Sequence, residues 1–141
     1  MKSVDLALAQ WLANGVLLQP GIVESIVLTK LRAVGRHASS DVVSLFASVN
    51  GMSAGECDDH VFSLWSIDQA ISEASSYEEH YLPFADFLLS SSVFLLRYES
   101  AERSSVWIQY DRRDVARQVA ASVAEFFDFL VHAPDSVEVV L

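Results

Sequence analysis

The chain has 141 residues, of which 52% are hydrophobic, and its formal net charge is −10. This length fits one domain that buries about two thirds of the surface exposed by the unfolded chain. Nucleic acids and anionic membranes are bound mainly by clusters of Lys and Arg, so the negative charge argues against both as partners. No stretch approaches the roughly 18 unbroken apolar residues of a membrane-spanning helix.

The N-terminus and the cysteine content both predict a cytoplasmic protein. Asp5 lies where a signal peptide would have a basic region leading into an apolar core. Cys57 is the only cysteine, so the chain forms no internal disulfide. That absence agrees with a reducing compartment.

Three amphipathic helices are predicted in an N-terminal helical part, residues 1–51. Their apolar residues recur at spacings of three and four. The three segments are residues 4–13, 22–34 and 40–49. A Gly or Asn-Gly that is typical of a helix C-terminus follows each of them, at Asn14-Gly15, Gly35 and Asn50-Gly51. Pro20-Gly21 predicts a turn between the first two helices, and Ser40 with Asp41 favours the start of the third.

Residues 60–133 predict a sheet and a closing helix, after a polar loop at 52–60. Short apolar runs separated by serine-rich turns indicate strands joined as antiparallel hairpins. The runs are residues 61–65, 84–89, 93–98 and 106–110. Pro83 cannot donate to a ladder, so it fits the start of a strand or an edge position. Residues 114–120 are compatible with either a strand or a helix.

Capping residues indicate where two further helices begin. Ser66 or Asp68 caps a short helix after the first strand. Ser122 and Glu125 have the spacing of a capping box, so the last helix begins at Ser122, and Pro134 closes it. The fold class is therefore α+β. It is a single domain, residues 1–141, with N-terminal helices and a C-terminal helix packed on a mainly antiparallel sheet.

Strand alternation assigns side chains to faces of this sheet. Phe84, Asp86 and Leu88 are predicted on one face of their strand. In the next strand, Val93, Leu95 and Arg97 share the side that is expected to meet solvent near the strand end. Trp65 is predicted in the core. Because apolar residues surround Asp86, it is expected to be a structural carboxylate bonded to the backbone or to an arginine.

The acidic residues are concentrated in the middle of the chain. No Lys or Arg occurs between His37 and Leu96. The acids in that span are Asp41, Glu56, Asp58, Asp59, Asp68, Glu73, Glu78, Glu79 and Asp86. Such a one-signed field attracts basic partners and speeds their encounter, although acidity also serves solubility alone.

Few residues are arranged for catalysis or metal binding. Cys57 and His60 have the spacing of half a zinc site, but no second Cys/His pair completes it. The acidic loop lacks the alternating oxygen ligands of an EF-hand. Nucleotide-binding glycine loops and serine-nucleophile elbows are absent from the sequence. We therefore expect no catalytic residues, no metal and no cofactor. A small hydrolase that uses Cys57 or Asp86 is the least favoured alternative.

Four segments in order resemble the SUKH superfamily. Residues 41–51 resemble its opening helix, which ends in Asn-Gly, here Asn50-Gly51. Residues 62–70 look like its strand that ends in Trp, here Trp65. Residues 82–87 are similar to its Pro-Phe-Ala strand and contain Pro83, Phe84 and Asp86. Residues 120–127 resemble the start of its closing helix, with Ser122 and Glu125. The match spans residues 40–132 and identifies the chain as a divergent member.

The resemblance implies a non-enzymatic α+β protein-binding domain. The superfamily contains bacterial immunity proteins that neutralise polymorphic toxins, and regulators such as a yeast cell-wall-synthesis factor. Together with the acidic middle of the chain, it favours an immunity protein for a toxin that is a basic nuclease. A regulatory or scaffold module without a toxin is the main alternative, and the high apolar content leaves room for a homodimer. The expected partner-binding residues are Glu56, Asp58, Asp59, Tyr77, Glu78, Glu79 and Tyr81.

Overall fold

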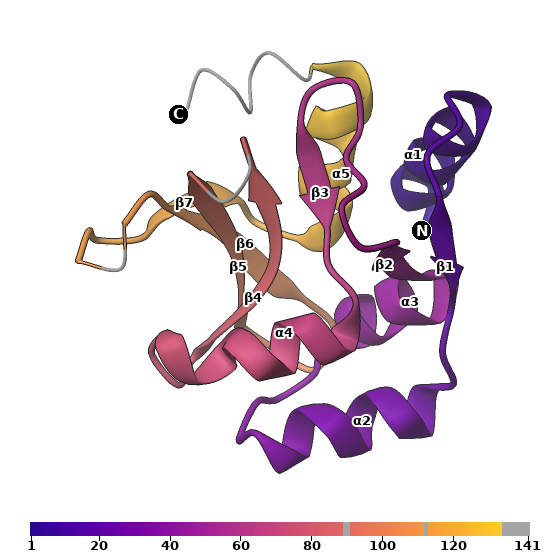
Figure 1. The fold of residues 1–141 in the computed structure, drawn as a ribbon. Coiled ribbons are helices and arrows are strands. Elements are labelled where there is room, and N and C mark those ends of the chain that lie inside the picture. Colours follow the sequence, from indigo (N-terminus) through magenta and orange to yellow (C-terminus); the bar gives the residue numbers. More distant parts are fainter. Residues whose placement is uncertain (89–90, 112, 134–141) are drawn as a thin grey trace.

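The computed structural model describes residues 1–88, 91–111 and 113–133, and they form a five-stranded antiparallel sheet with helices packed on it (Figure 1). The helices are α1 (Lys2–Ala13), α2 (Glu24–Ala33), α3 (Ser40–Ser48), α4 (Ile67–Glu73), the 3-10 helix η1 (Ala74–Ser76) and α5 (Val123–His132). The strands of the large sheet are β3 (Phe62–Leu64), β4 (Tyr81–Phe87), β5 (Ser92–Tyr98), β6 (Ser104–Gln109) and β7 (Arg117–Ala120). The α+β class is confirmed. No helix of the described residues is long and apolar enough to cross a membrane.

A second, two-stranded sheet was not predicted. It pairs β1 (Leu18–Pro20) with β2 (Val49–Met52). The segment expected to be a turn at Pro20 is thus partly a strand, and Asn50 and Gly51 lie in a strand directly after α3. Gly51 has φ +76°, and a Cβ there would lie 2.3 Å from the Trp65 carbonyl carbon. Glycine is therefore required by the close approach of two backbones.

Helix α2 is shorter and less buried than its apolar pattern predicts. It spans ten residues and begins at Glu24. Val27 and Leu31 are fully buried, whereas Val23 and Ile26, which belong to the same three-and-four apolar spacing of segment 22–34, are exposed. The predicted apolar stripe is therefore wrong for the N-terminal turn of this helix.

Strand β4 contains a bulge that changes which face Asp86 lies on. The pairing with β5 shifts register between Pro83 and Ala85, and an extra residue at a bulge reverses the alternation beyond it. Phe84 packs on Phe126 in the main core, whereas Asp86 bonds Trp65 in a separate cluster. The expectation that Phe84 and Asp86 share a face was wrong. Pro83 is also not the first residue of its strand but lies at this bulge, where a missing N–H is tolerated.

Both faces of the sheet are buried, by different means. The inner face packs on the helices through rings that contact one another, namely Phe62, Phe84, Phe94, Phe126 and Phe127. The outer face is covered by a small cluster of Trp65, Tyr81, Val93 and Leu95, with Tyr77 and Trp107 packed against it. Leu95 has no exposed surface and Val93 is buried. The prediction that this side of β5 meets solvent near the strand end holds for Arg97, which is half-buried.

The closing helix is capped nearly as predicted. Ser122 Oγ accepts a hydrogen bond from Glu125 N at 3.1 Å. Glu125 Oε1 accepts from the N–H of Ala121, one residue before the expected donor. Residues 117–120, left open between strand and helix, are a strand. The predicted stop at Pro134 lies outside the described residues.

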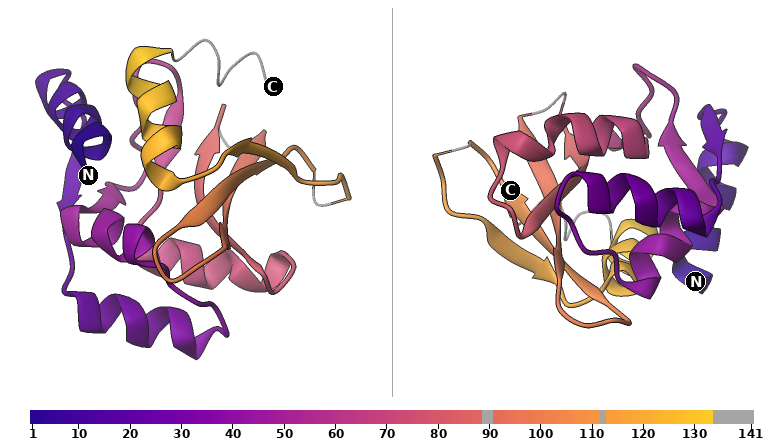
Figure 2. Two further views of the ribbon diagram at one scale, coloured as in Figure 1. Left: turned by 180° about the vertical axis from the view of Figure 1, so that it is seen from behind. Right: turned by 90° about the horizontal axis from the view of Figure 1, so that it is seen from below.

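Long-range hydrogen bonds attach the helices α1 and α3 to α5 and β6. Helix α1 lies beside α5 (Figure 2), and Ser3 Oγ donates to Ala124 O at 2.9 Å. The Asp41 carboxylate accepts from Ser104 N at 3.1 Å and from Val123 N at 3.3 Å. It thereby joins the first turns of α3 and α5 to β6, a role that the sequence did not reveal.

Candidate functional site

The expected partner-binding residues lie at the two ends of β4. The loop with Glu56, Asp58 and Asp59 leads into β3, whose first residue, Phe62, pairs with Phe87 at the end of β4. Residues 77–81 lead into the start of the same strand. A seven-residue strand is about 20 Å long. The structure therefore divides these residues into two separate groups.

Asp58 is held inside the first group by three donors. Its Oδ1 accepts from His60 N and Phe62 N, both at 2.9 Å, and its Oδ2 accepts from Trp11 Nε1 at 3.2 Å. Burial raises the pKa of Asp58, and these hydrogen bonds offset part of the rise. The carboxylate joins α1 to the start of β3, so its oxygens already have partners within the chain.

The other two acids of this loop differ from each other, because Glu56 is bonded within the chain and Asp59 is exposed. Glu56 is half-buried, and its Oε1 accepts from Leu17 N at 2.9 Å. Ser63 Oγ donates to the Glu56 carbonyl at 2.8 Å, so the loop is fixed on both sides. Asp59 is exposed, and its carboxylate lies 3.9 Å from His60 Nε2. Of these three acids, Asp59 is the one presented to solvent.

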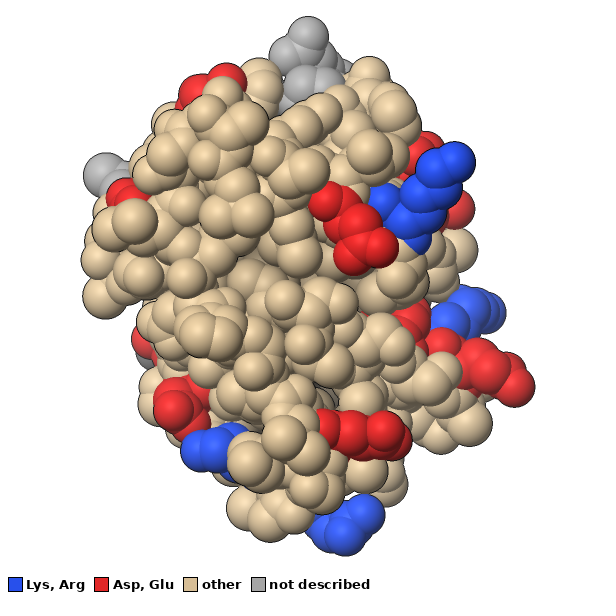
Figure 3. Space-filling view, turned by 90° about the vertical axis from the view of Figure 1, so that its right-hand side faces the viewer, with Lys and Arg blue, Asp and Glu red and all other residues tan. Residues whose placement is uncertain are grey.

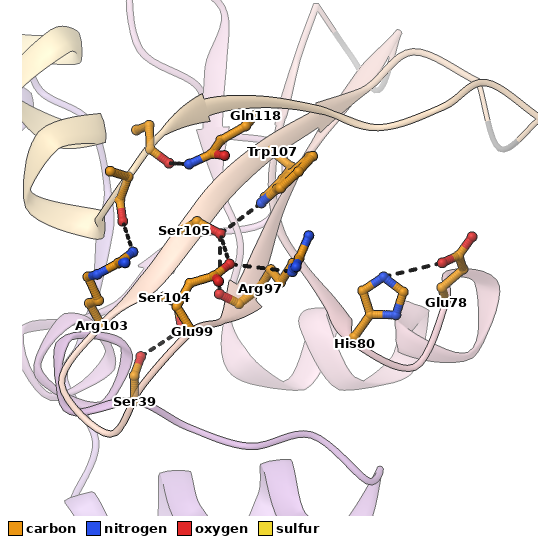
Figure 4. Close-up of polar contacts among 12 residues, drawn as sticks. Ser39, Glu78, His80, Arg97, Glu99, Arg103, Ser104, Ser105, Trp107 and Gln118 are labelled. Atoms are coloured by element: carbon orange, nitrogen blue, oxygen red, sulfur yellow. Dashed lines mark hydrogen bonds and ion pairs between the residues drawn. The ribbon is translucent and has the colours of Figure 1, made fainter.

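In the second group the acids are exposed and the tyrosines are not. Glu78 and Glu79 are exposed, and Glu78 Oε2 lies 3.3 Å from His80 Nε2 (Figure 4). Tyr81 is buried and Tyr77 is half-buried, because both pack on the outer cluster around Trp65. The two rings therefore cover the sheet and do not project toward a partner.

A single arginine holds this second group in place. The Arg36 guanidinium donates to the Val34 carbonyl at the end of α2. It also donates to four backbone carbonyls between the end of α4 and the start of β4, those of Ala74, Tyr77, Glu78 and Tyr81. Burial lowers the pKa of Arg36, and the charge of Glu79 acts in the opposite direction. Backbone acceptors leave no pattern in a sequence, so this residue was missed.

The β5–β6 end of the outer face is closed by its own polar contacts (Figure 4). Ser105 Oγ accepts from Trp107 Nε1 at 2.8 Å and donates to Glu99 Oε2 at 2.6 Å. Arg97 lies over the Trp107 ring, 5.1 Å from its centroid, and its Nε is 3.4 Å from Glu99 Oε2. These groups satisfy one another, as a structural network does.

The β3–β4 end of the outer face is different because it borders a cavity of about 240 Å³. The lining includes Met52, Glu56, Cys57, Leu64, Gln69 and Asp86. Asp86 is 8% exposed, and its Oδ2 accepts from Trp65 Nε1 at 2.7 Å. The expected partner, backbone or arginine, was wrong, since the donor is the indole.

The candidates for catalysis and for metal binding divide between two hollows. Cys57 lines the cavity at Asp86, whereas His60 lines another hollow beside Trp11 and Asp58. Within residues 1–88, 91–111 and 113–133, no three His, Cys, Asp or Glu side chains are grouped to hold a metal.

The face formed by α1, β1 and α2 is poor in charge. Figure 3 looks onto it and shows broad uncharged areas between scattered acidic and basic groups. On these elements or directly before them, Leu12, Leu17 and Val23 are each more than half exposed, at 63%, 63% and 65%. Exposed apolar side chains on neighbouring elements make this face a second candidate surface for a protein partner.

Comparison with known proteins adds no family assignment. The chain matches no family model and no curated protein.

Proposed function

We propose that this chain is a cytoplasmic, non-enzymatic protein-binding module that binds a basic protein. The function that fits best is that of a bacterial immunity protein of SUKH type, which neutralises a toxin such as a basic nuclease. The resemblance over residues 40–132 and the span from His37 to Leu96 without Lys or Arg support this proposal.

One observation carries the proposal further than composition does. The exposed acids Asp59 and Glu78, with side chains 72% and 75% exposed, have histidines as their ion-pair partners among the described residues. Both ends of β4 therefore present an exposed carboxylate that no Lys or Arg of the described residues pairs with. A Lys- or Arg-rich protein would be attracted to this charge, and the attraction would chiefly speed encounter.

The test uses the basic protein that co-purifies with this chain from its native cells. Its association rate is measured by stopped-flow fluorescence at low and high salt. The test variant combines Asp59→Asn, Glu78→Gln and Glu79→Gln. Its matched control combines Asp5→Asn, Glu24→Gln and Glu102→Gln, which are exposed acids outside the cation-free span. Both variants change the net charge equally.

We expect the test variant to slow association several-fold at low salt and to flatten the salt dependence. The control variant should change the rate much less. Equal slowing by both variants would reject this placement of the interface. If no basic protein is captured at all, the proposed function itself fails.

The regulatory or scaffold alternative would use the uncharged face instead. Leu12, Leu17 and Val23 favour it, because their exposed apolar surface would be buried against a partner. A variant with Leu12→Ser and Val23→Ser should then abolish capture of the partner, while the triple acid variant leaves it unchanged. The reverse result supports the acidic interface.

A further inference from the structure

The inference concerns the cavity beside Asp86, at the β3–β4 end of the outer sheet face. Asp86 pairs with Ser63 on β3 and with Val93 on β5, so its side chain projects from an interior position of the sheet, and the residue is more than nine-tenths buried. Burying a carboxylate is costly unless donors or a cation compensate it.

The compensation supplied by the chain is incomplete. Oδ2 accepts from the Trp65 indole. No hydrogen bond or ion pair from the described residues reaches Oδ1. The described structure also has no fully buried side-chain oxygen or nitrogen without a partner. Because Asp86 lines the cavity, its Oδ1 is open to that space.

The rest of the lining suits a cation carried on an aliphatic stem. Met52 and Leu64 supply apolar wall, and Glu56 supplies a second carboxylate. Among the described residues, its Oε1 accepts from Leu17 N and its Oε2 has no donor. Gln69 is exposed at the same cavity and offers an amide oxygen. Among the described residues, the lining contains no Lys or Arg. Long cationic side chains bury their stems along apolar surface and pair their heads with carboxylates.

We propose that this cavity receives an arginine or lysine side chain of the protein partner, whose charged head pairs with Asp86 and Glu56. That this side chain belongs to a protein partner rests on the proposed function. The loop that forms the wall is fixed by Leu17 and Ser63, so the cavity is present before binding. A partner residue that enters it is an anchor of the kind that dominates interface energy.

The test is a titration of the whole chain, labelled with ¹⁵N, with N-acetyl-arginine amide and separately with N-acetyl-lysine amide. The three tryptophan indole N–H signals serve as reporters, since each has a different partner. Trp65 reports on Asp86, Trp11 on Asp58 and Trp107 on Ser105. We expect a saturable shift of the Trp65 signal with little change in the other two.

Asp86→Asn should remove that shift while keeping an acceptor for the Trp65 indole. Asp59→Asn, a matched loss of one charge outside the cavity, should keep it. An unchanged Trp65 signal in the native chain, or equal movement of all three indoles, would overturn the proposal. Putrescine and MgCl₂ are titrated in the same way, as alternative ligands. A tighter response to either one would mean a metabolite or metal site and would also overturn it.

A second measurement needs no variant that might misfold. The Cys57 thiol lines the same cavity. Saturating N-acetyl-arginine amide should therefore slow the alkylation of Cys57 by iodoacetamide at least about twofold. An unchanged alkylation rate counts against the proposal. Both measurements use the chain alone with small cations. The cavity can therefore fail while a basic partner is still captured, and the two failures remain distinguishable.

Discussion

Two tryptophan–aspartate pairs do similar work in this fold and differ in what they leave open. Trp11 donates its indole N–H to Asp58 at 3.2 Å, and Trp65 donates to Asp86 at 2.7 Å. Asp58 has two further backbone donors, whereas Asp86 has the indole alone among the described residues. With three donors, Asp58 serves only to hold the fold. With one donor, Asp86 is also placed to receive a ligand.

The largest expected effect in this comparison comes from removing the outer-face indole. Trp65 is 2% exposed, so Trp65→Ala should lower the free energy of unfolding by about 3–5 kcal/mol, measured by urea denaturation. Trp65→Phe keeps most of the ring but strands Asp86, and should cost about 1–3 kcal/mol. A loss below about 1 kcal/mol for the alanine variant would show that the outer cluster adds little stability.

The next effect compares the two carboxylates directly. Asp58→Ala leaves three donors without an acceptor and should cost about 2–3 kcal/mol, whereas Asp86→Ala strands one donor and should cost about 1 kcal/mol. Urea unfolding of both variants gives the two values. If Asp86→Ala proved the costlier change, the distinction between the two pairs would be lost.

A pH series sharpens the same distinction. Since burial raises the pKa of Asp58, the folded chain holds that proton more tightly than the unfolded chain. The resulting stability is fully present below about pH 4, where an unfolded aspartate titrates, and is lost as the pH rises through the raised folded pKa. The stability of the native chain relative to Asp58→Asn should therefore fall as the pH rises above about pH 4 and through the raised folded pKa. A constant difference would contradict this.

The smallest effect is expected next to Asp58. Asp59 is exposed and lies 3.9 Å from a histidine, so Asp59→Ala should change the free energy of unfolding by less than about 0.5 kcal/mol. The same urea assay checks it. A larger loss would mean that the exposed acid of this loop also holds the fold.

The elements that were predictable depend on local patterns. Helix α3 with its buried stripe, the serine cap of α5 and the antiparallel hairpins each follow from residues a few positions apart. By contrast, β1 and β2 pair Leu18 with Met52 through strands of three and four residues. Such short segments have no usable periodicity, and Asn50-Gly51 is equally typical of a helix end.

The candidate site was less predictable because it depends on backbone geometry. Asp58 and Asp59 are neighbours in sequence, and only the path of the loop gives one of them three donors. The bulge at Pro83 moves Asp86 to the outer face, against the simple alternation of the strand. The acidity of the region was visible in the sequence. Which acids reach solvent was not.

The packing of α1 on α5 has a consequence for how the chain folds during synthesis. Ser3 and Ala124 are separated by 121 residues. At about 5–20 residues per second, α1 leaves the ribosome roughly 6–24 s before its partner helix exists. Throughout that interval the side chains of Val4, Ala7 and Trp11, buried in the finished fold, lack α5 to cover them. Helix α1 therefore reaches its final packing only after α5 has been made.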